Sequence, residues 1–415
     1  MRQLLVSAYG CWPGRGSELG VGWEWCKQMA KANHLHIITI KRSKDAIEDA
    51  CNKFDKELVR NMTFHYFDYS PKVIKLLPAG TIRWYLYYTL WQLGALKKAR
   101  KLKKEHHFDY VMHLTFGSVW LPTFMYKLGI PYIWGPWGGC DVVPKSFLKE
   151  VNPKASSFLS WMQSKREWLV NHISWNPIIK ANLKNAAAIL VRTQGNYCAV
   201  PLLYREKAKI VLETALILPP PINLTGVNND AIRILNTGRL IPTKNLPMAI
   251  KAVASLAQNY NVTFDIIGGG SDKDSLNDLI SSLGMESCIR ILEPMKRELL
   301  LKIIPQYDIY LFPSLLEGGS WALMEAMGCG LPTVCFDAAG MSVITDDSCA
   351  IKIPMNNPEQ SLRDMTEALT KLCADSQLRK EMGKNAAIRI KEKFNWDNKG
   401  MFMEELLQEL DNDNK

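Results

Sequence analysis

The sequence predicts an α/β protein with two domains, each built on a doubly wound parallel sheet. Its 415 residues are too many for one ordinary hydrophobic core. Apolar strand-like segments alternate with helix-like segments along most of the chain, which is the pattern of parallel sheets. The alternation stops once, at residues 217–230, where three successive prolines disfavour both helix and sheet.

The first predicted domain covers residues 1–216 and the second covers residues 217–385. The first opens with a strand, an amphipathic helix and a strand at Gln3–Tyr9, Glu18–Ala32 and Leu35–Lys41. Later apolar runs in it predict strands at Asp109–Leu114, Tyr132–Trp134 and Ala188–Val191. In the second domain we expect strands at Ile232–Asn236, Thr263–Ile267, Ile289–Leu292, Ile309–Phe312 and Thr333–Phe336. The tail from Ser361 to Leu410 is expected to be helical.

Charge and tryptophan are divided unevenly along the chain. Residues 1–220 contain 31 Lys and Arg against 15 Asp and Glu, whereas the remainder contains 20 against 26. Eleven of the 13 tryptophans also fall in the first part. A basic surface can bind nucleic acid, but the chain has no recognisable nucleic-acid motif. Contact between the first domain and a membrane surface fits the tryptophans better.

Cysteine usage points to a reduced, cytosolic protein. The ten cysteines form no CxxC pair and have no His-Cys spacing suited to zinc. Arg2 is followed directly by a strand-like run, so we expect no signal peptide. Asp272 and Asp274 form an Asp-x-Asp pair, but at a helix start they fit cap and dipole partners better than metal ligands. We therefore expect no metal and no cofactor.

Two glutamates frame the most informative segment of the chain. An apolar strand ends near Pro313, Glu317 follows on a loop, and Glu325 lies about one turn into a helix-favouring run. The residues between them include Gly318, Gly319 and Ser320. Ser320 is a suitable N-cap, and the unpaired amides at a helix start attract an anion. The alternative is a solvated helix with two surface acids.

Two cations follow the first strand of the second domain. Arg239 and Lys244 lie five residues apart in ILNTGRLIPTKN. An Arg fork and a Lys point charge fixed in one loop could bind an anionic group such as a phosphate without a metal. The alternative is a pair of solvated surface cations.

These two segments resemble the signatures of retaining family-4 glycosyltransferases of the GT-B fold. In that family the first glutamate contacts the donor sugar, the second contacts the ribose, and the intervening amides hold the diphosphate. The resemblance implies these roles for Glu317, Glu325 and residues 318–320. It also implies two Rossmann-like domains facing a cleft, with a C-terminal helix at 386–415 returning to the first domain. The usual Glu-Gly-Phe-Gly is Glu-Gly-Gly-Ser here, and only four residues separate Arg239 from Lys244.

Three further segments of the first domain are candidate parts of the site. Residues 15–18 resemble the family's Gly-Gly-Ala-Glu loop, so Gly16 could approach the donor diphosphate or the acceptor, with Ser17 capping the helix. His113 follows a strand where family members often carry a histidine that contacts the donor sugar; the alternative is a satisfied core histidine. The glycines at 135, 138 and 139 could shape the acceptor site or form a turn.

The resemblance implies transfer of a hexose-type sugar from a nucleotide diphosphate to a hydroxyl, with retention of configuration. UDP is favoured as the donor nucleotide, because UDP-sugars are frequent donors in this family. The expected acceptor is a glycan or lipid-linked oligosaccharide in surface polysaccharide biosynthesis. A sugar-nucleotide epimerase of the same fold, a phosphorylase that needs pyridoxal phosphate, and a non-catalytic nucleotide-sugar-binding subunit are the alternatives.

The first domain also has features of a peripheral membrane protein. Residues 84–96 are uncharged but too few to span a bilayer, and six cations follow within residues 97–104. Trp161, Trp168 and Trp175 recur every seven residues, which on one helix would align their indoles. We expect contact with the inner face of an anionic membrane. Alternatively, these tryptophans pack between helices or line the acceptor site.

Overall fold

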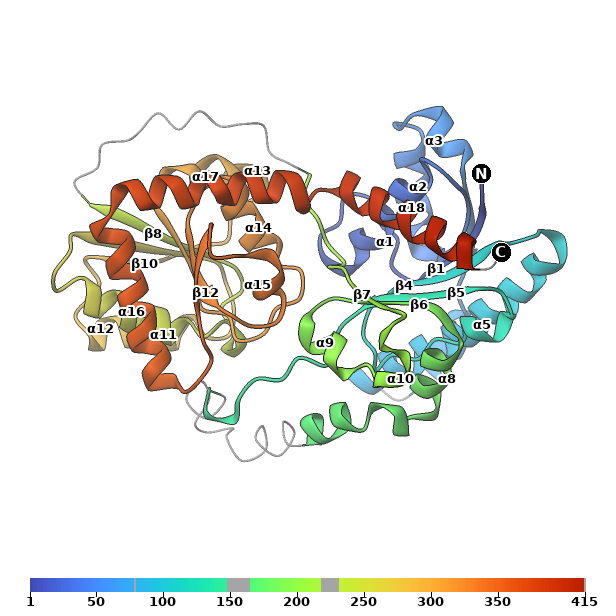
Figure 1. The fold of residues 1–415 in the computed structure, drawn as a ribbon, viewed down its shortest axis with the longest axis horizontal. Coiled ribbons are helices and arrows are strands. Elements are labelled where there is room, and N and C mark those ends of the chain that lie inside the picture. Colours follow the sequence, from blue (N-terminus) through green and yellow to red (C-terminus); the bar gives the residue numbers. More distant parts are fainter. Residues whose placement is uncertain (78–79, 148–164, 218–230, 414–415) are drawn as a thin grey trace. The chain divides into compact units, whose positions relative to one another are not determined.

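The computed structural model describes residues 1–77, 80–147, 165–217 and 231–413, which form two compact units (Figure 1). Unit 1 contains residues 1–140, 169–214 and 396–415. Unit 2 contains residues 141–168 and 215–395. The proline-rich break predicted at 217–230 falls almost wholly outside the described residues. None of the described helices combines the length and the apolar character needed to cross a bilayer.

Unit 1 is built on a parallel sheet of seven strands in the order β3-β2-β1-β4-β5-β6-β7. The strands are β1 (Gln3–Ala8), β2 (His34–Ile40), β3 (Met62–Phe67), β4 (Tyr110–Thr115), β5 (Tyr132–Trp137), β6 (Ala186–Val191) and β7 (Ala208–Ile210). Leu4 of β1 is in register with Leu35 of β2 and with Tyr110 of β4. The strand order therefore reverses between β1 and β4, which creates a switch point at their carboxyl ends.

Helices cover both faces of this sheet, which explains the apolar character of its strands. All six residues of β4 are buried, as expected for a strand covered on both sides. The fully buried side chains of this core include Tyr88, Trp91 and Trp137. The helices of unit 1 are α1 (Ser17–Met29), α2 (Lys44–Cys51), α3 (Lys56–Arg60), α4 (Pro71–Lys75), α5 (Thr81–Glu105), α8 (Pro177–Asn185), α9 (Gln194–Ala199), α10 (Leu202–Arg205), α18 (Trp396–Asp413) and the 3-10 turns η1 (Lys41–Ser43), η2 (Met125–Leu128) and η4 (Ile173–Trp175).

The last helix, α18, belongs to unit 1, although the chain reaches it only after unit 2. The indole of Trp396 packs edge-on against Trp25 of α1, with ring centroids 6.4 Å apart. Arg2 forms ion pairs with Glu404 at 2.6 Å and Asp411 at 2.8 Å. Residues 386–393 lie in the preceding helix, α17, which is part of unit 2.

Unit 2 repeats the architecture with six parallel strands in the order β10-β9-β8-β11-β12-β13. These are β8 (Ile232–Thr237), β9 (Val262–Ile267), β10 (Ile289–Leu292), β11 (Ile309–Phe312), β12 (Thr333–Phe336) and β13 (Ala350–Ile353). Its helices are α11 (Leu246–Leu256), α12 (Lys273–Ser282), α13 (Arg297–Ile303), α14 (Trp321–Gly328), α15 (Ala339–Ile344), α16 (Pro358–Ala374), α17 (Ser376–Lys393), with 3-10 turns η5 (Pro242–Lys244) and η6 (Ile304–Gln306). The switch point of this sheet lies between β8 and β11.

The predicted α/β class with two doubly wound sheets is confirmed, and each predicted strand has a counterpart in the structure. Sequence patterns missed β3, β7 and β13. β3 lies at one edge of its sheet and is mostly half-buried. β7 has only three residues, and β13 contains a lysine. Edge position, short length and a charge each weaken the apolar run on which the prediction depends.

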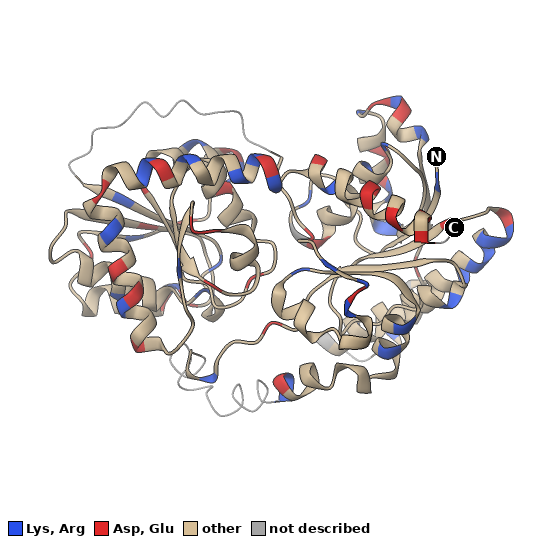
Figure 2. Ribbon diagram, in the orientation of Figure 1, with Lys and Arg blue, Asp and Glu red and all other residues tan. Residues whose placement is uncertain are grey.

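Charged side chains of unit 1 gather at the C-terminal end of α5, where Figure 2 shows a group of blue segments. The exposed residues there include Lys97, Arg100, Lys101 and Lys104. Lys103 is also in this group, and its Nζ donates to the Leu128 carbonyl at 2.6 Å. The six predicted cations therefore form a real surface cluster on one helix end.

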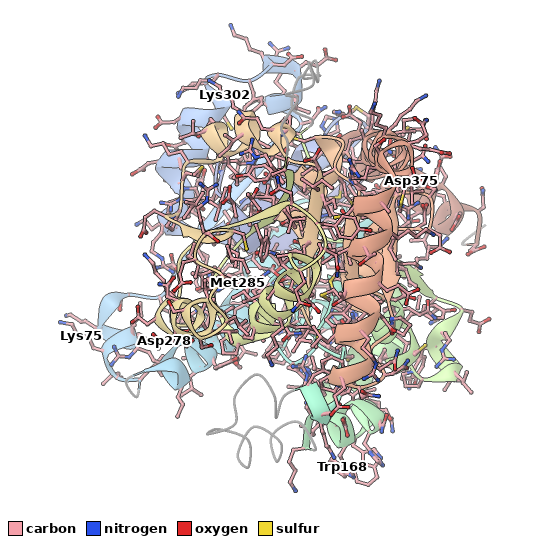
Figure 3. The ribbon with its side chains drawn as sticks, turned by 90° about the vertical axis from the view of Figure 1, so that its left-hand side faces the viewer. Lys75, Trp168, Asp278, Met285, Lys302 and Asp375 are labelled. Carbon is pink, nitrogen blue, oxygen red and sulfur yellow. The ribbon has the colours of Figure 1, made fainter. Side chains whose placement is uncertain are left out.

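The predicted stripe of three tryptophans does not lie on one continuous helix. A helix covers residues 165–171 and ends before η4, which contains Trp175. Trp168 (Figure 3) and Trp175 are 47% and 69% exposed, and Trp175 packs edge-on against His172. Trp161 lies outside the described residues. The turn at residue 172 breaks the helical register on which the alignment depended.

Candidate functional site

Lys244 and Glu317 form an ion pair at the switch point of unit 2. Lys244 ends the turn η5 after β8, and Glu317 follows the neighbouring strand β11. Lys244 Nζ contacts Glu317 Oε1, and Ser314 Oγ donates to the same carboxylate oxygen at 3.2 Å. The two side chains are only 13% and 21% exposed. A cation and a carboxylate are thus fixed together at the sheet edge where ligands bind in such folds.

The backbone ties the loops after β8 and β11 to each other. Leu315 N donates to the Thr243 carbonyl at 2.9 Å. Lys244 Nζ also lies 5.1 Å from the centre of the Phe312 ring, at the end of β11. These contacts hold the ammonium group of Lys244 at the end of β11, next to the loop that carries Glu317. Arg239, the second predicted cation, is exposed in the loop after β8.

The glycine run at 268–270 packs against the loop that carries Arg239. A Cβ added to Gly268 would lie 1.8 Å from the Gly238 carbonyl oxygen, and one on Gly270 would lie 2.1 Å from that of Leu240. Leu240 N donates to the Gly269 carbonyl at 3.0 Å. Only glycine permits this close approach of two backbones. The glycine run therefore packs directly against the loop that carries Arg239 and supports it.

Ser320 caps α14, as predicted. Its Oγ accepts a hydrogen bond from Leu323 N at 3.3 Å, and the side chain is buried. Gly318 and Gly319 lie in the bend just before the cap, and both are half-buried. The helix start therefore has a fixed position directly after Glu317, with its positive dipole end toward the glycine bend.

Glu325 lies in α14 and is 5% exposed. Burial raises the pKa of its carboxyl group, and the guanidinium of Arg297 opposes this rise. Arg297 Nε donates to Glu325 Oε1 at 2.5 Å. Sequence reasoning missed Arg297, which begins α13. Only the fold brings it to Glu325, so no local signal could have identified it.

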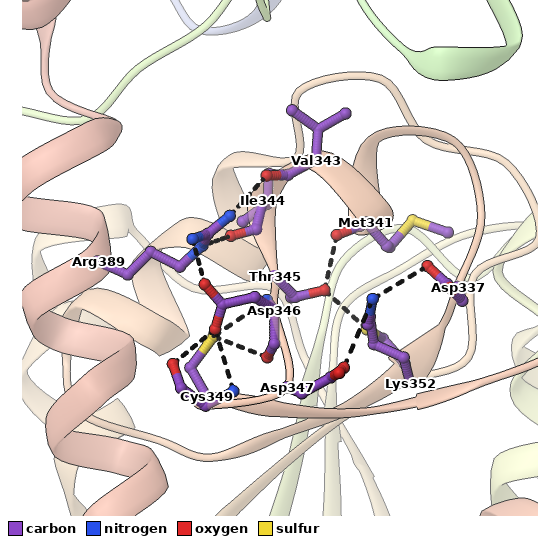
Figure 4. A network of polar contacts seen from close by, with 12 residues as sticks. Asp337, Met341, Val343, Ile344, Thr345, Asp346, Asp347, Cys349, Lys352 and Arg389 are labelled. Atoms are coloured by element: carbon purple, nitrogen blue, oxygen red, sulfur yellow. Dashed lines mark hydrogen bonds and ion pairs between the residues drawn. The ribbon is translucent and has the colours of Figure 1, made fainter.

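A polar network fixes α15, which supports the Glu317 loop. Gly340 N donates to the Glu317 carbonyl at 2.8 Å, and a Cβ on Gly340 would lie 1.7 Å from the Gly318 oxygen. At the other end of α15, Arg389 of α17 donates to the carbonyls of Ile344 at 2.6 Å and Val343 at 3.1 Å (Figure 4). Arg389 also forms an ion pair with Asp346. The Glu317 loop is thus held from behind by a braced helix.

Gly16 and His113, the remaining candidates, belong to unit 1. Gly16 occupies the N-cap position of α1 with extended backbone, so the helix begins at Ser17, and the expectation that Ser17 would be the cap is wrong. His113 is 3% exposed in β4, and its Nε2 lies 3.5 Å from the Tyr88 hydroxyl. Burial lowers the pKa of His113 to about 3, so the imidazole is neutral near pH 7. It can accept or donate a hydrogen bond but adds no positive charge there.

The glycines within β5 and directly after it are packed tightly. Gly135 and Gly139 have φ of 119° and 105°, which favour glycine. A Cβ on Gly135 would lie 2.1 Å from the Leu190 oxygen, and Trp120 Nε1 donates to the Gly139 carbonyl at 2.8 Å. Of the two interpretations left open for this segment, these contacts favour a backbone turn.

In the described part of the chain, no three His, Cys, Asp or Glu side chains gather in a way that could hold a metal ion. Asp272 takes the N-cap position of α12, but its side chain makes no capping hydrogen bond; Asp274 lies in the first turn. All ten cysteines are free thiols.

Most of unit 2 matches a known protein family. Residues 223–389 match the family described as glycosyl transferases group 1. A curated relative is the D-inositol 3-phosphate glycosyltransferase of Corynebacterium jeikeium, which is 29% identical over 182 residues. The match covers 42% of this chain and 42% of that protein. The chain thus spans less than half the length of the curated relatives it matches.

Two solved structures have the same fold over almost the whole chain. Anabaena Alr3699/HepE in complex with UDP has a TM-score of 0.60 at 15% identity, covering 99% of this chain and 100% of that one. The lipopolysaccharide outer core galactosyltransferase WaaB in its apo form has a TM-score of 0.63 at 14% identity, covering 99% of both chains. At such identities the likeness establishes the fold alone. It confirms the predicted GT-B class.

Proposed function

We propose that this protein, whose residues 223–389 match the family described as glycosyl transferases group 1, is a retaining glycosyltransferase. It would move a sugar from a nucleotide diphosphate to a hydroxyl group of a glycan or lipid-linked oligosaccharide. The observation that carries this proposal is the ion pair of Lys244 and Glu317 beside the capped start of α14. It combines a cation, a carboxylate and a helix N-terminus at one sheet edge, which are the groups that a sugar diphosphate requires.

Each residue has a proposed role that follows from its place. Lys244 and Arg239 stabilise the negative charge that develops on the departing diphosphate. The amides of residues 318–320 bind the same diphosphate at the start of α14. Glu317 orients the donor sugar and favours its cationic transition state. Glu325, held by Arg297, accepts hydrogen bonds from the ribose hydroxyls.

The proposed reaction needs no second carboxylate as a nucleophile. The bond between the anomeric carbon and the β-phosphate oxygen breaks, and its electron pair leaves with the nucleoside diphosphate. The acceptor oxygen forms a new bond to the anomeric carbon on the same face. Its proton passes to the departing phosphate oxygen. The configuration is retained because the new bond forms on the face that the leaving group occupied. In unit 1, His113 and Gly16 are proposed to contact the donor, His113 as a neutral hydrogen-bonding group.

A binding screen would identify the donor. We favour UDP, and the structure of Anabaena Alr3699/HepE with UDP supports this choice by analogy of fold. Purified protein would be titrated with UDP-, GDP-, ADP- and dTDP-sugars. The nucleotide that binds most tightly then serves as the donor in assays of transfer and of donor breakdown.

Substitution of the ion pair tests the catalytic assignment. Glu317→Ala and Lys244→Ala are expected to lower transfer by two or more orders of magnitude, while both variants stay folded and their melting temperatures fall by no more than a few degrees. Glu286→Ala and Lys302→Ala are matched controls, because both residues are exposed in the same unit. Normal turnover in the double variant of Glu317 and Lys244 would refute the assignment. Sugar conversion without any acceptor would indicate an epimerase instead.

We also propose that unit 1 binds the inner face of an anionic membrane through α5. Ile82, Leu86 and Leu93 are 62%, 40% and 44% exposed and lie on one face of this helix. Lys97, Arg100 and Lys104 continue the same face toward the C-terminal end. Apolar side chains followed by cations suit insertion at the headgroup level of anionic lipid. The outer core galactosyltransferase WaaB, which shares the fold, is named for a lipopolysaccharide.

Vesicle binding tests this surface. Wild-type protein should co-sediment with anionic vesicles and less so in high salt. Gln at positions 97, 98, 100, 101 and 104 should weaken sedimentation while UDP affinity stays unchanged; Lys103 is kept because it anchors the Leu128 carbonyl. Equal sedimentation with neutral and anionic vesicles would exclude the proposed role of the cations. No sedimentation with either would exclude the membrane and favour a soluble acceptor.

A further inference from the structure

A pocket of about 840 Å³ lies in unit 1 at the carboxyl ends of β1, β2 and β3. These strands are neighbours in the sheet, so the residues that follow them meet at one edge. The start of α5 contributes Arg83, Trp84 and Tyr87 to the lining. Its lining residues are Tyr9, Lys41, Arg42, Asp68, Tyr69, Ser70, Ile74, Gly80, Arg83, Trp84 and Tyr87.

Cations outnumber acids in this lining. The lining contains three cations, Lys41, Arg42 and Arg83, but only one carboxylate, that of Asp68. Both oxygens of Asp68 are engaged: Oδ2 accepts a hydrogen bond from Lys41 N at 2.8 Å, and Oδ1 accepts one from the Tyr87 hydroxyl. Asp68 therefore joins the ends of β2 and β3 to α5. The pocket keeps an excess of positive charge that favours an anionic ligand.

The two arginines are placed differently. Arg42 is exposed at the start of the pocket wall, in η1. Arg83 is half-buried, and its Nε donates to the Leu77 carbonyl at 3.3 Å, which fixes the direction of its side chain. Guanidinium groups bind phosphate and carboxylate through paired N–H donors, so two of them in one pocket suit such a group.

The pocket also has an aromatic wall, whose rings are held in place by neighbouring rings. Trp84 is half-buried and stacks on Tyr88 with centroids 5.6 Å apart, and Phe116 packs edge-on against it at 5.6 Å. Tyr9 is packed by Trp91 at 4.9 Å and by Phe116 at 5.2 Å. Supported aromatic rings beside a few polar groups are typical of small-ligand sites. A pyranose, whose C–H bonds form an apolar face, can pack against this wall.

We propose that this pocket binds an anionic saccharide, a sugar that carries a phosphate or a carboxylate. Arg42 and Arg83 bind the anionic group, and Trp84 packs against the sugar ring. The assignment of this saccharide as the acceptor rests on the proposed glycosyltransferase function. Binding itself does not depend on that function, since every residue named lies in unit 1.

Calorimetric titration with four probes tests the proposal: glucose 6-phosphate, glucuronate, glucose and inorganic phosphate. Glucose 6-phosphate or glucuronate should bind at least ten-fold more tightly than glucose and inorganic phosphate. The preference between the first two tells a phosphate-bearing ligand from a carboxylate-bearing one. Arg42→Gln and Arg83→Gln should each remove most of the advantage over glucose, whereas Trp84→Ala should weaken all three sugars. Arg60→Gln is the matched control, because Arg60 is exposed in unit 1 but lies outside the pocket and outside the basic end of α5.

Equal binding of glucose and both anionic sugars would overturn the proposal, as would equal binding of inorganic phosphate and glucose 6-phosphate. Melting curves accompany each variant, and Arg42→Gln is the safer one because Arg83 anchors a backbone carbonyl. UDP affinity should stay at the wild-type value in both arginine variants. Conversely, Lys244→Ala should leave the binding of the anionic sugars unchanged. A failure of this inference is therefore distinguishable from a failure of the proposed function.

Discussion

Lys244 and Glu317 are 73 residues apart in sequence, yet their side chains pair at the ends of two adjacent strands. If one of the two side chains is replaced by an uncharged one, the charge of the other stays partly buried without its ion-pair partner. We expect Lys244→Met or Glu317→Gln alone to lower the free energy of unfolding by about 1–2 kcal/mol. The double variant should lose less than the sum of the two. Urea denaturation of all four proteins measures the coupling, and strictly additive losses would contradict it.

Arg297 is expected to set the pH range of nucleotide binding through Glu325. Burial raises the pKa of Glu325, and Arg297 limits the rise. In Arg297→Gln the pKa of Glu325 should therefore rise further, so the carboxylate becomes protonated at a higher pH. UDP affinity, measured from pH 5 to 8, should decline at a higher pH than in the wild type. Arg297→Lys should restore part of the difference, and an unchanged profile in Arg297→Gln would oppose the assigned role of Glu325.

Two substitutions at Ser320 separate capping from anion binding. Ser320→Ala removes the acceptor for Leu323 N and should cost about 1 kcal/mol of unfolding free energy. Ser320→Asp keeps an acceptor at the cap, so stability should change less, but its negative charge repels a diphosphate. UDP affinity should fall at least ten-fold in Ser320→Asp. Wild-type affinity in that variant would place the diphosphate elsewhere.

Gly340 is expected to be intolerant of a single methyl group. In Gly340→Ala the added Cβ would collide with the Gly318 oxygen, which forces the Glu317 loop to move. UDP affinity and melting temperature should both fall. Gly328→Ala is the matched control, because its Cβ would lie 3.5 Å from Ile390, an ordinary contact distance. If Gly340→Ala kept the UDP affinity and melting temperature of Gly328→Ala, the position of the Glu317 loop would be unimportant for both.

His113 should make the protein sensitive to mild acid. Its pKa is about 3 in the folded chain, below the ordinary value of 6.5. Below pH 6.5 the unfolded chain binds a proton that the folded chain does not, so stability falls as the pH falls toward 3. Between pH 7 and pH 5 this group should cost about 2 kcal/mol. In His113→Asn that part of the pH dependence should vanish in denaturation curves, while the exposed His107→Asn should retain it.

Local sequence signals were sufficient for part of the site. Glu317, Ser320 and Glu325 lie within one strand–loop–helix segment, so their spacing and the capping preference of serine predicted their positions correctly. Arg239 and Lys244 likewise follow one strand, and the fold places the Lys244 ammonium beside Glu317.

Features that depend on distant segments could not be predicted in this way. Arg297 reaches Glu325 only because the sheet order brings α13 near α14, and Arg389 braces α15 from a helix 45 residues further along. The pocket of unit 1 combines residues after three strands with the start of α5. The burial of His113 also depends on tertiary packing, which a strand pattern does not reveal.

The place of α18 in unit 1 has a consequence for biosynthesis. During translation, residues 215–395 emerge as a nearly complete unit 2, whereas unit 1 waits for the helix that pairs with Arg2 and packs on Trp25. Until α18 leaves the ribosome, the apolar surface of α1 around Trp25 lacks its cover, and nascent unit 1 exposes a surface suited to chaperone binding. Ribosomes that stall just before residue 396 should therefore carry a folded unit 2 beside a protease-sensitive unit 1.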